Sequence, residues 1–259
     1  MRYLVLVVVF LILGRSSFAA VRTTTLEYKQ ADTVCQGYLA WDDAVAGKRP
    51  GVLVVPEWWG LNDYAKSRAR ELASLGYVAL AVDMYGQGRV AADARQAGEL
   101  AAAMRNDRRL MRNRIEAALA AIRRQPQVDG ARIAAIGYCF GGGVVLELAR
   151  DGADVRGVVS FHGNLDTPSP EATRNVKAKI LVCHGADDPH VPMSQVEGFI
   201  DEMKRAGANY EINIYSGAVH AFTNPAAGNN PASGAAYNEQ AATRAREAMK
   251  LFFNEVFRN

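Results

Sequence analysis

Short apolar runs that alternate with helical stretches constrain this chain more than any other feature of its sequence. The clearest runs are Gly51 to Val55 and Tyr77 to Val82, and both are continuous rather than interrupted by polar residues. Continuous runs of this kind are typical of strands buried on both faces, as in parallel sheets. Because such strands alternate with helices along the chain, we expect an α/β fold whose mostly parallel sheet carries helices on both faces.

The same alternation extends over the rest of the 259 residues. Strands are expected at residues 23–28, 35–40, 51–55, 77–82, 132–136, 155–160, 180–183 and 210–215. Helices are expected at residues 64–75, 91–104, 109–124, 141–150, 193–205 and 238–257. The segment 224–236 is rich in Pro, Gly and Asn, which predicts a loop inside the domain rather than a linker. We therefore expect a single domain, which a chain of this length can form.

Composition and charge exclude several classes of protein. Apolar residues make up 49% of the chain and charged residues 22%, which is ordinary for a globular protein and excludes a disordered or collagen-like one. The chain has 30 basic and 27 acidic residues and no dense basic block, so nothing favours nucleic-acid binding. We expect a monomer that acts on a small molecule and requires neither a metal nor a cofactor.

The first residues form a signal-peptide pattern. Arg2 provides a positive charge, Leu4 to Leu13 is an unbroken apolar run, and the small residues of Ser17-Phe18-Ala19 precede a cleavage site. As a helix, that apolar run spans about 15 Å, roughly half of a bilayer core. We predict a signal peptide at residues 1–19, a mature domain at residues 20–259, and a periplasmic or secreted protein without stable membrane association. An uncleaved N-terminal anchor is the alternative.

The chain has three cysteines, Cys35, Cys139 and Cys183. An odd number in an exported protein leaves at least one thiol free unless that thiol pairs between chains. Exported proteins usually avoid a free reactive thiol, because oxidation inactivates it. One of the three is therefore expected to have a function, and the local sequence favours Cys139.

Cys139 lies in the most informative stretch of the chain, residues 133–150. This stretch predicts a strand, a tight turn that reads G-x-C-x-G-G, and a helix. A nucleophile elbow has this shape, here with Cys in place of the usual Ser. Gly137 and Gly141 would let the helix and the strand approach closely, and the helix N-terminus would favour the thiolate. The alternative is that Cys139 is only a small buried side chain.

An acid and a base follow in the chain order expected after such a nucleophile. Asp188 lies in the loop pattern G-x-x-D-x-x-V-P after a strand, with Asp187 as the second choice, and His220 follows the next predicted strand. This order predicts a triad in which His220 is the general base and Asp188 orients it. The alternatives are that the two aspartates only cap a turn and that His220 is structural. Structural positions without metal-site spacing are expected for the other histidines, His162, His184 and His190.

The loop after the strand at residues 51–55 is expected to complete the site. Backbone amides of Trp58 and Phe140 would stabilise a developing oxyanion. Glu57 precedes Trp58, and a carboxylate at the mouth of the site could accept the thiol proton. The alternative for Glu57 is a surface residue that caps a turn.

Five motifs, taken in order, resemble the dienelactone hydrolase family of α/β-hydrolases. They are P-E-W-W-G-L-N at residues 56–62, A-V-D-M-Y-G at 81–86, G-Y-C-F-G-G at 137–142, D-x-x-V-P at 188–192 and H-A-F at 220–222. The resemblance runs from about Glu27 to the final helix and implies an α/β-hydrolase fold without a large cap. It implies a Cys-His-Asp triad at Cys139, His220 and Asp188. It also implies that Glu57 pairs with the resting thiol and takes its proton, because a neutral thiol attacks esters poorly.

The residues that would bind substrate depart from the family pattern. The namesake enzymes hold a substrate carboxylate with two arginines, and Gln87 and Asn224 stand at those positions here. An amide does not replace a bidentate arginine without loss, so the natural substrate stays open. Arg89 is expected to substitute for the first arginine. Aromatic residues expected near a small apolar acyl group, unless they belong to the core, are Trp58, Trp59, Tyr85 and Phe222.

The sequence therefore predicts a hydrolase of small carboxylic esters or enol-lactones, similar to dienelactone hydrolase (carboxymethylenebutenolidase), that forms an acyl thioester on Cys139. The family reaction is hydrolysis of an enol-lactone in the breakdown of chlorinated catechols, whereas a signal peptide would place this protein outside the cytoplasm. Two other functions stay open. One is a hydrolase fold that only binds a ligand, against which the complete set of catalytic residue types argues. The other is a thiol-dependent acyltransferase; redox exchange is disfavoured because the chain lacks a C-x-x-C pair.

Overall fold

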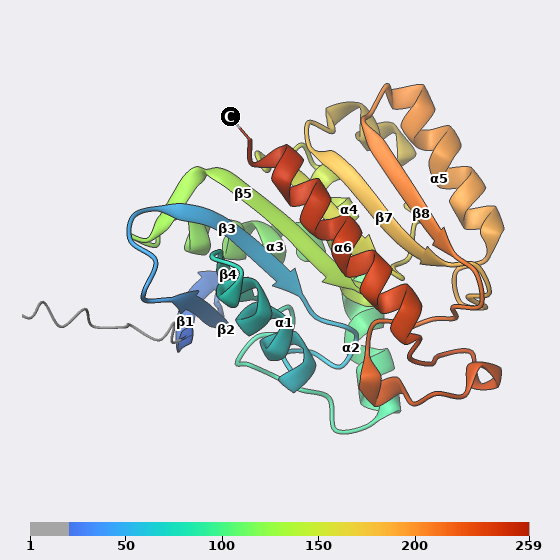
Figure 1. Cartoon of the computed structure of the whole chain (residues 1–259), viewed down its shortest axis with the longest axis horizontal. Helices are drawn as coiled ribbons and strands as arrows, with labels where there is room; N and C mark the ends of the chain where they lie inside the picture. Colours follow the sequence, from blue (N-terminus) through green and yellow to red (C-terminus); the bar gives the residue numbers. More distant parts are fainter. Residues whose placement is uncertain (1–20, 259) are drawn as a thin grey trace, which may run out of the picture.

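The computed structural model describes residues 21–258, which form one eight-stranded sheet with helices on both faces (Figure 1). The strands are β1 (Val21–Gln30), β2 (Thr33–Asp42), β3 (Arg49–Val55), β4 (Val78–Ala81), β5 (Val128–Tyr138), β6 (Gly157–Phe161), β7 (Lys179–Gly185) and β8 (Tyr210–Tyr215). The helices are α1 (Asp63–Ser74), α2 (Ala94–Asn106), α3 (Arg108–Arg123), α4 (Phe140–Arg150), α5 (Met193–Ala206) and α6 (Glu239–Val256). Three short 3-10 turns are η1 (Pro170–Asn175), η2 (Pro225–Ala227) and η3 (Pro231–Ser233). The predicted signal peptide lies outside the described residues.

The strand order in the sheet is β1-β2-β4-β3-β5-β6-β7-β8. Strands β3 to β8 run parallel to their neighbours among themselves, whereas β1 and β2 pair antiparallel as a hairpin that β2 joins to β4. The prediction of a mostly parallel sheet is confirmed. The hairpin occupies the edge, where a strand needs only one apolar face, and most of β1 is accordingly exposed or half-buried.

Two apolar layers hold the sheet between its helices. Side chains of α1 and α6 pack on one face, and side chains of α2, α3, α4 and α5 pack on the other; Figure 1 shows α1 and α6 in front of the sheet and α3 and α4 behind it. Every residue of α4 is buried, because this helix lies under the centre of the sheet. The helix that carries the nucleophile turn is therefore the most firmly packed one.

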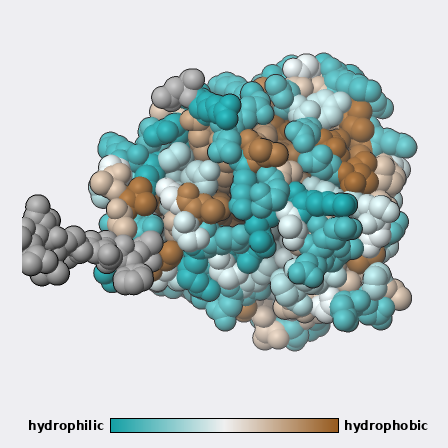
Figure 2. Space-filling view, viewed as in Figure 1, coloured by the Kyte–Doolittle hydropathy of each residue, from teal (hydrophilic) through white to brown (hydrophobic). Residues whose placement is uncertain are grey.

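The outer surface is mixed rather than apolar. Figure 2 shows small apolar patches separated by hydrophilic residues over the face that α6 covers. The most exposed large apolar side chain there, Leu251 of α6, is 70% accessible and is an isolated case of a common surface feature. Among residues 21–258, no helix combines the length and apolar character needed to cross a bilayer.

Candidate active site

The turn between β5 and α4 holds Cys139 in a strained conformation. Its φ is +52°, in the left-handed region that non-glycine residues rarely adopt. A side chain at Gly137 would meet the carbonyl oxygen of Gly141 at 1.9 Å, and one at Gly141 would meet that of Val55 at 2.3 Å. Only glycine permits these approaches, so the reason that the sequence suggested for both glycines is confirmed. Strain of this kind persists where the surrounding structure fixes it, and it is common at functional sites.

Strand register brings Glu57 and Cys139 to the same edge of the sheet. Val55 of β3 pairs with Gly137 of β5 in parallel. Glu57 and Cys139 each follow their paired residue by two positions, so both leave the carboxyl ends of neighbouring strands. Ligands of open α/β sheets bind at this edge.

Asp188 and His220 follow β7 and β8, which also pair in parallel. The Oδ2 atom of Asp188 lies 2.8 Å from Nδ1 of His220. Its Oδ1 atom accepts hydrogen bonds from the amides of His190 at 2.8 Å and Val191 at 3.1 Å. The carboxylate is thereby fixed in a buried position, as an orienting acid must be. Asp187, the second choice, is exposed.

His220 lies beside the Cys139 thiol and is hydrogen-bonded to Asp188. Burial alone would lower the pKa of His220, but the hydrogen bond to Asp188 and the neighbouring Cys139 sulfur outweigh burial and raise that pKa to about 10. The structure therefore brings the three side chains of Cys139, His220 and Asp188 together at the edge of the cleft.

Glu57 is a second buried carboxylate beside this group, with 4% of its surface accessible. Its Oε2 atom accepts a hydrogen bond of 2.8 Å from Nδ2 of Asn224. Burial raises the pKa of Glu57 to about 7, although the Asn224 amide and the nearby His220 lower it. The family resemblance implied that Glu57 pairs with the resting thiol. In the structure Asn224 binds the carboxylate, and both Glu57 and Cys139 line the same cleft.

Two backbone amides are available for an oxyanion. Neither the Phe140 amide nor the Trp58 amide donates to an acceptor among the described residues. The Tyr85 hydroxyl donates to the Trp58 carbonyl at 2.9 Å, and Asp83 Oδ1 accepts the amides of Tyr85 at 3.1 Å and Gly86 at 2.8 Å. Tyr85 therefore supports the loop that carries the Trp58 amide.

A cleft of about 860 Å³ opens beside the thiol, and the rings of Trp58 and Trp59 line it at a centroid distance of 5.2 Å. Of the residues predicted to bind substrate, Trp59 lies in this lining. Tyr85 and Phe222 are instead buried outside it, because their rings pack into the core, and Arg89 is exposed. Of the five side chains expected near the substrate, the structure thus places three, Tyr85, Arg89 and Phe222, away from the cleft wall.

Arg105, and not Arg89, is an arginine that lines the cleft. It comes from the last turn of α2 and lines the cleft. One guanidinium nitrogen, Nη2, donates to Oδ1 of Asn164 at 3.2 Å, and the guanidinium carbon lies 5.7 Å from the centre of the Phe140 ring. No ion pair joins it to a carboxylate within residues 21–258. Sequence reasoning missed Arg105 because it is one of many arginines on amphipathic helices, and nothing in their spacing marks it.

The other three histidines take different positions. His190 lines the cleft, with its ring 5.2 Å from that of His220. His184 is buried and neither ring nitrogen has a hydrogen-bond partner. His162 is buried and Nδ1 of its ring accepts the Cys139 amide at 3.1 Å. In the part of the chain that the structure describes, no group of three or more His, Cys, Asp or Glu side chains could hold a metal ion.

Comparison with known proteins gives a consistent family. The model of the dienelactone hydrolase family matches residues 35–257. A Bradyrhizobium protein named "Probable 2-oxo-3-(5-oxofuran-2-ylidene)propanoate lactonase" is 30% identical over 216 residues, which cover 78% of this chain and 86% of the relative.

Two solved structures are similar over almost the whole chain. One, named m3DLH, is 41% identical with a TM-score of 0.89, and the match covers 92% of this chain and all of the other. A dienelactone-hydrolase-like promiscuous phosphotriesterase from metagenomic libraries is also 41% identical, with the same coverage and a TM-score of 0.87.

Proposed function

The chain belongs to the dienelactone hydrolase family, and from that premise we propose that it hydrolyses small carboxylic esters or lactones with Cys139 as the nucleophile. The observation that carries the proposal is the position of His220, which is hydrogen-bonded to Asp188 and lies beside the Cys139 thiol at the wall of an open cleft. A histidine between a thiol and a buried carboxylate is the geometry of nucleophilic acyl transfer.

In the first half-reaction, the Cys139 thiolate attacks the acyl carbon, and a carbon–sulfur bond forms as the carbonyl oxygen becomes an oxyanion. The amides of Phe140 and Trp58, which donate to no acceptor among the described residues, would stabilise that charge. The carbon–oxygen bond then breaks, and His220 gives its proton to the leaving oxygen. An acyl thioester remains on Cys139; for a lactone, the released oxygen stays on the acyl chain.

In the second half-reaction, water attacks the thioester. His220 takes a proton from that water, Asp188 stabilises the imidazolium, and the carbon–sulfur bond breaks to return the thiolate. Glu57 faces the same cleft, and Asn224 occupies only one of its two oxygens. With a pKa of about 7, its carboxylate could take a proton from a neutral Cys139 thiol when substrate binding disturbs the pair with His220.

The cleft supports an acyl group with an apolar part and an anionic part. Trp58 and Trp59 offer aromatic surface, and Arg105 offers a cation without a carboxylate partner among the described residues. A charge-assisted hydrogen bond is worth about 1.5–3 kcal/mol. We therefore expect Arg105→Met to weaken kcat/KM for carboxylate-bearing substrates by at least about tenfold, and to leave neutral esters nearly unchanged.

The test is hydrolysis of aryl esters and enol-lactones, with and without a carboxylate, by wild type, Cys139→Ala and Arg105→Met. The proposal expects turnover by wild type and none by Cys139→Ala. If Cys139→Ala hydrolyses the same substrates at a similar rate, the cysteine is not the nucleophile. If wild type turns over none of them, ligand binding without catalysis becomes the better account.

Two related activities belong in the same panel. A phosphotriester tests whether this chain also has the phosphotriesterase activity for which its 41%-identical structural relative is named. A thiol acceptor tests acyl transfer, because a transferase would need that acceptor in place of water. Hydrolysis that does not depend on an added thiol would exclude the transferase.

We also propose that residues 1–19 direct export and are removed. Expression of the full chain in a bacterium that secretes through the general pathway, followed by intact mass of the periplasmic protein, tests this. A mass that corresponds to a chain beginning near Ala20 is expected. A chain that keeps its N-terminus and stays with the membrane fraction would contradict cleavage.

A further inference from the structure

A buried polar chain begins at the backbone of the nucleophile and uses residues that the mechanism above does not. His162 directly follows β6, whose last residue Phe161 pairs with Tyr138 of β5. The Cys139 amide lies 3.0 Å from the Phe161 carbonyl oxygen and 3.1 Å from Nδ1 of His162, and it donates to both. Because an amide only donates, Nδ1 of His162 must be an acceptor and carry no proton.

The other ring nitrogen of His162 continues the chain. Its Nε2 atom lies 2.7 Å from the hydroxyl oxygen of Thr223, and that hydroxyl lies 2.8 Å from the hydroxyl of Tyr64. The Tyr64 hydroxyl donates to the Thr223 carbonyl oxygen at 3.1 Å. A neutral imidazole has one N–H group, so Nε2 donates to Thr223 and Thr223 donates to Tyr64. Every donor in these contacts then has an acceptor, and only this tautomer lets the His162 ring accept the Cys139 amide alongside the Phe161 carbonyl oxygen.

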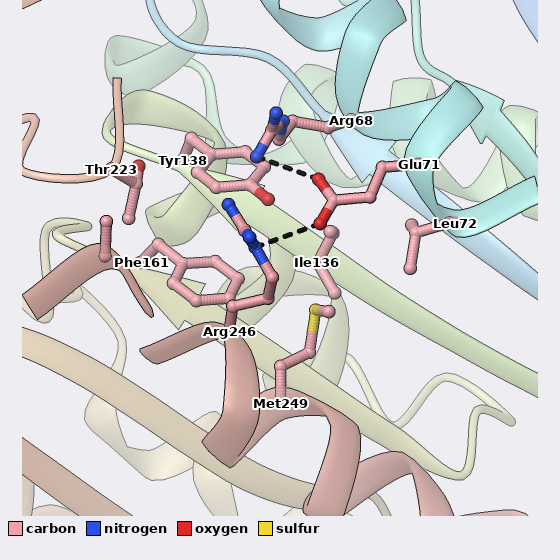
Figure 3. A pocket seen from close by; sticks show the side chains of 10 residues that line it. Arg68, Glu71, Leu72, Ile136, Tyr138, Phe161, Thr223, Arg246 and Met249 are labelled. Carbon is pink, nitrogen blue, oxygen red and sulfur yellow. Dashed lines mark ion pairs between the residues drawn. The ribbon is translucent and has the colours of Figure 1, made fainter. Parts of the chain in front are cut away.

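The charged side chains near these hydrogen bonds form ion pairs with other residues. Figure 3 shows Thr223 at the wall of a cavity of about 20 Å³ behind Tyr138. Arg68 and Arg246 lie across that cavity, and both bind Glu71, at 2.9 Å each. These ion pairs leave the Thr223 hydroxyl to His162 and Tyr64. Burial keeps the pKa of His162 well below its ordinary value, so the ring stays neutral.

This row of hydrogen bonds, which runs from the Cys139 amide through His162 and Thr223 to Tyr64, joins two strained turns. Cys139 has a φ of +52° and His162 a φ of +41°. The hydrogen bond between the Cys139 amide and the His162 ring ties the two turns together at the carboxyl ends of β5 and β6. Thr223 belongs to the segment that begins with His220, so the same chain links the nucleophile turn to the loop of the base.

We propose that His162 is a positioning residue. As the Nε2–H tautomer fixed by Thr223, it holds the Cys139 turn so that the thiol stays beside the His220 ring. This rests on the proposed role of Cys139. A misplacement of reacting atoms by about 1 Å costs on the order of a hundredfold in rate. Loss of the hydrogen bonds through His162 should therefore lower kcat and the alkylation rate of Cys139. We expect KM to change little, because His162 does not line the cleft.

A matched set of variants tests the proposal. Thr223→Val keeps the shape of the side chain and removes its hydroxyl, whereas Thr223→Ser restores the hydroxyl. Thr223→Val is expected to lower kcat by about tenfold or more with KM within about twofold, and Thr223→Ser to recover most of that loss. Tyr215→Phe is the control, because it removes another buried hydroxyl, the one bonded to Cys183. The proposal is overturned if Thr223→Val matches Thr223→Ser, or if Tyr215→Phe loses as much kcat as Thr223→Val.

The tautomer is measured without any substrate. Long-range nitrogen–proton NMR of protein labelled at its four histidines separates the two neutral tautomers, and His162→Asn assigns the signal. His162 should give the Nε2–H pattern from pH 6 to 8 in wild type. An Nδ1–H or doubly protonated ring would overturn the proposal even if the enzyme is active. An inactive wild type with the expected NMR pattern would instead count against the proposed hydrolysis alone.

Discussion

Cys139 and Cys183 are the same side chain in two opposite surroundings, although only β6 separates their strands in the sheet. Cys183 lies within β7, fully buried, and the Tyr215 hydroxyl donates to its sulfur at 3.7 Å. Burial raises the pKa of Cys183 to about 12. Cys139 lies one residue beyond β5, lines the cleft, and lies beside His220.

The difference teaches that position along the strand, and not the residue type, decides which thiol can react. A thiolate needs a positive neighbour and access to solvent. Cys183 has neither, and burial likewise raises the pKa of Cys35. The turn after β5 supplies both conditions at once, because it exposes the sulfur and begins α4 beneath it.

The largest expected effect comes from Asp188→Asn. This change keeps the shape of the side chain but removes the charge that orients His220, so the imidazole can adopt the wrong tautomer. We expect kcat to fall by about 10³–10⁴-fold, and alkylation of Cys139 at pH 7 to be slower than in wild type. Steady-state kinetics and iodoacetamide labelling measure the two effects. A kcat within tenfold of wild type would show that Asp188 does not orient the base.

The next effect concerns Glu57, whose pKa of about 7 should appear in catalysis. If its ionised form takes the thiol proton, kcat/KM of wild type rises with pH through about 7, and Glu57→Gln lowers kcat/KM by about 10²-fold and removes this rise. The pH profile from 5 to 9 measures both. If kcat/KM of Glu57→Gln still rises with pH through about 7, the ionisation belongs to another group.

The same group makes stability depend on pH. Burial raises the pKa of Glu57 from 4.5 to about 7, so the native state keeps a proton that the unfolded chain has released between those values. The favourable contribution is present below pH 4.5 and is lost as pH rises through 7. Relative to Glu57→Gln, wild type should lose up to about 3 kcal/mol of unfolding free energy between pH 4.5 and 8. Urea melts at both pH values test this, and parallel curves would contradict it.

The smallest expected effect concerns Cys183, the buried thiol in the comparison with Cys139. Cys183→Ala removes a buried sulfur and leaves a small cavity, for which we expect a cost of about 1–2 kcal/mol in unfolding free energy. Its kcat should stay within about twofold of wild type, since nothing in the mechanism uses that thiol. If Cys183→Ala is fully folded but loses most of its kcat, the distinction between a reactive Cys139 and an inert Cys183 is wrong.

The sequence predicts most of this fold because its signals are local. Apolar runs locate each strand to within a few residues, and the spacing of Gly137 and Gly141 around Cys139 reflects a backbone contact that glycine alone allows. Chain order then places Asp188 and His220 after the correct strands. These features depend on neighbours in sequence or on a fixed order of elements.

Side-chain partners could not be predicted in the same way. Asn224 binds Glu57 across 167 positions and Thr223 binds His162 across 61 positions, and no periodicity reports such contacts. Tyr85 was expected at the substrate, but its hydroxyl lies on the Trp58 carbonyl because the Asp83 loop turns it inward. One signal was available for His162, since a polar residue that directly follows a buried strand lies at the edge where sites form.

The most direct test of the central claim is to trap the acyl enzyme. Wild-type protein is mixed with a chromogenic aryl ester, quenched in acid within milliseconds, digested and mapped by mass spectrometry. We expect one acyl group on the peptide that contains Cys139, absent from those of Cys35 and Cys183, and labile to hydroxylamine as a thioester is. Turnover of the ester in the same sample with Cys139 unmodified at every quench time, together with undiminished hydrolysis by Cys139→Ala, would contradict the account.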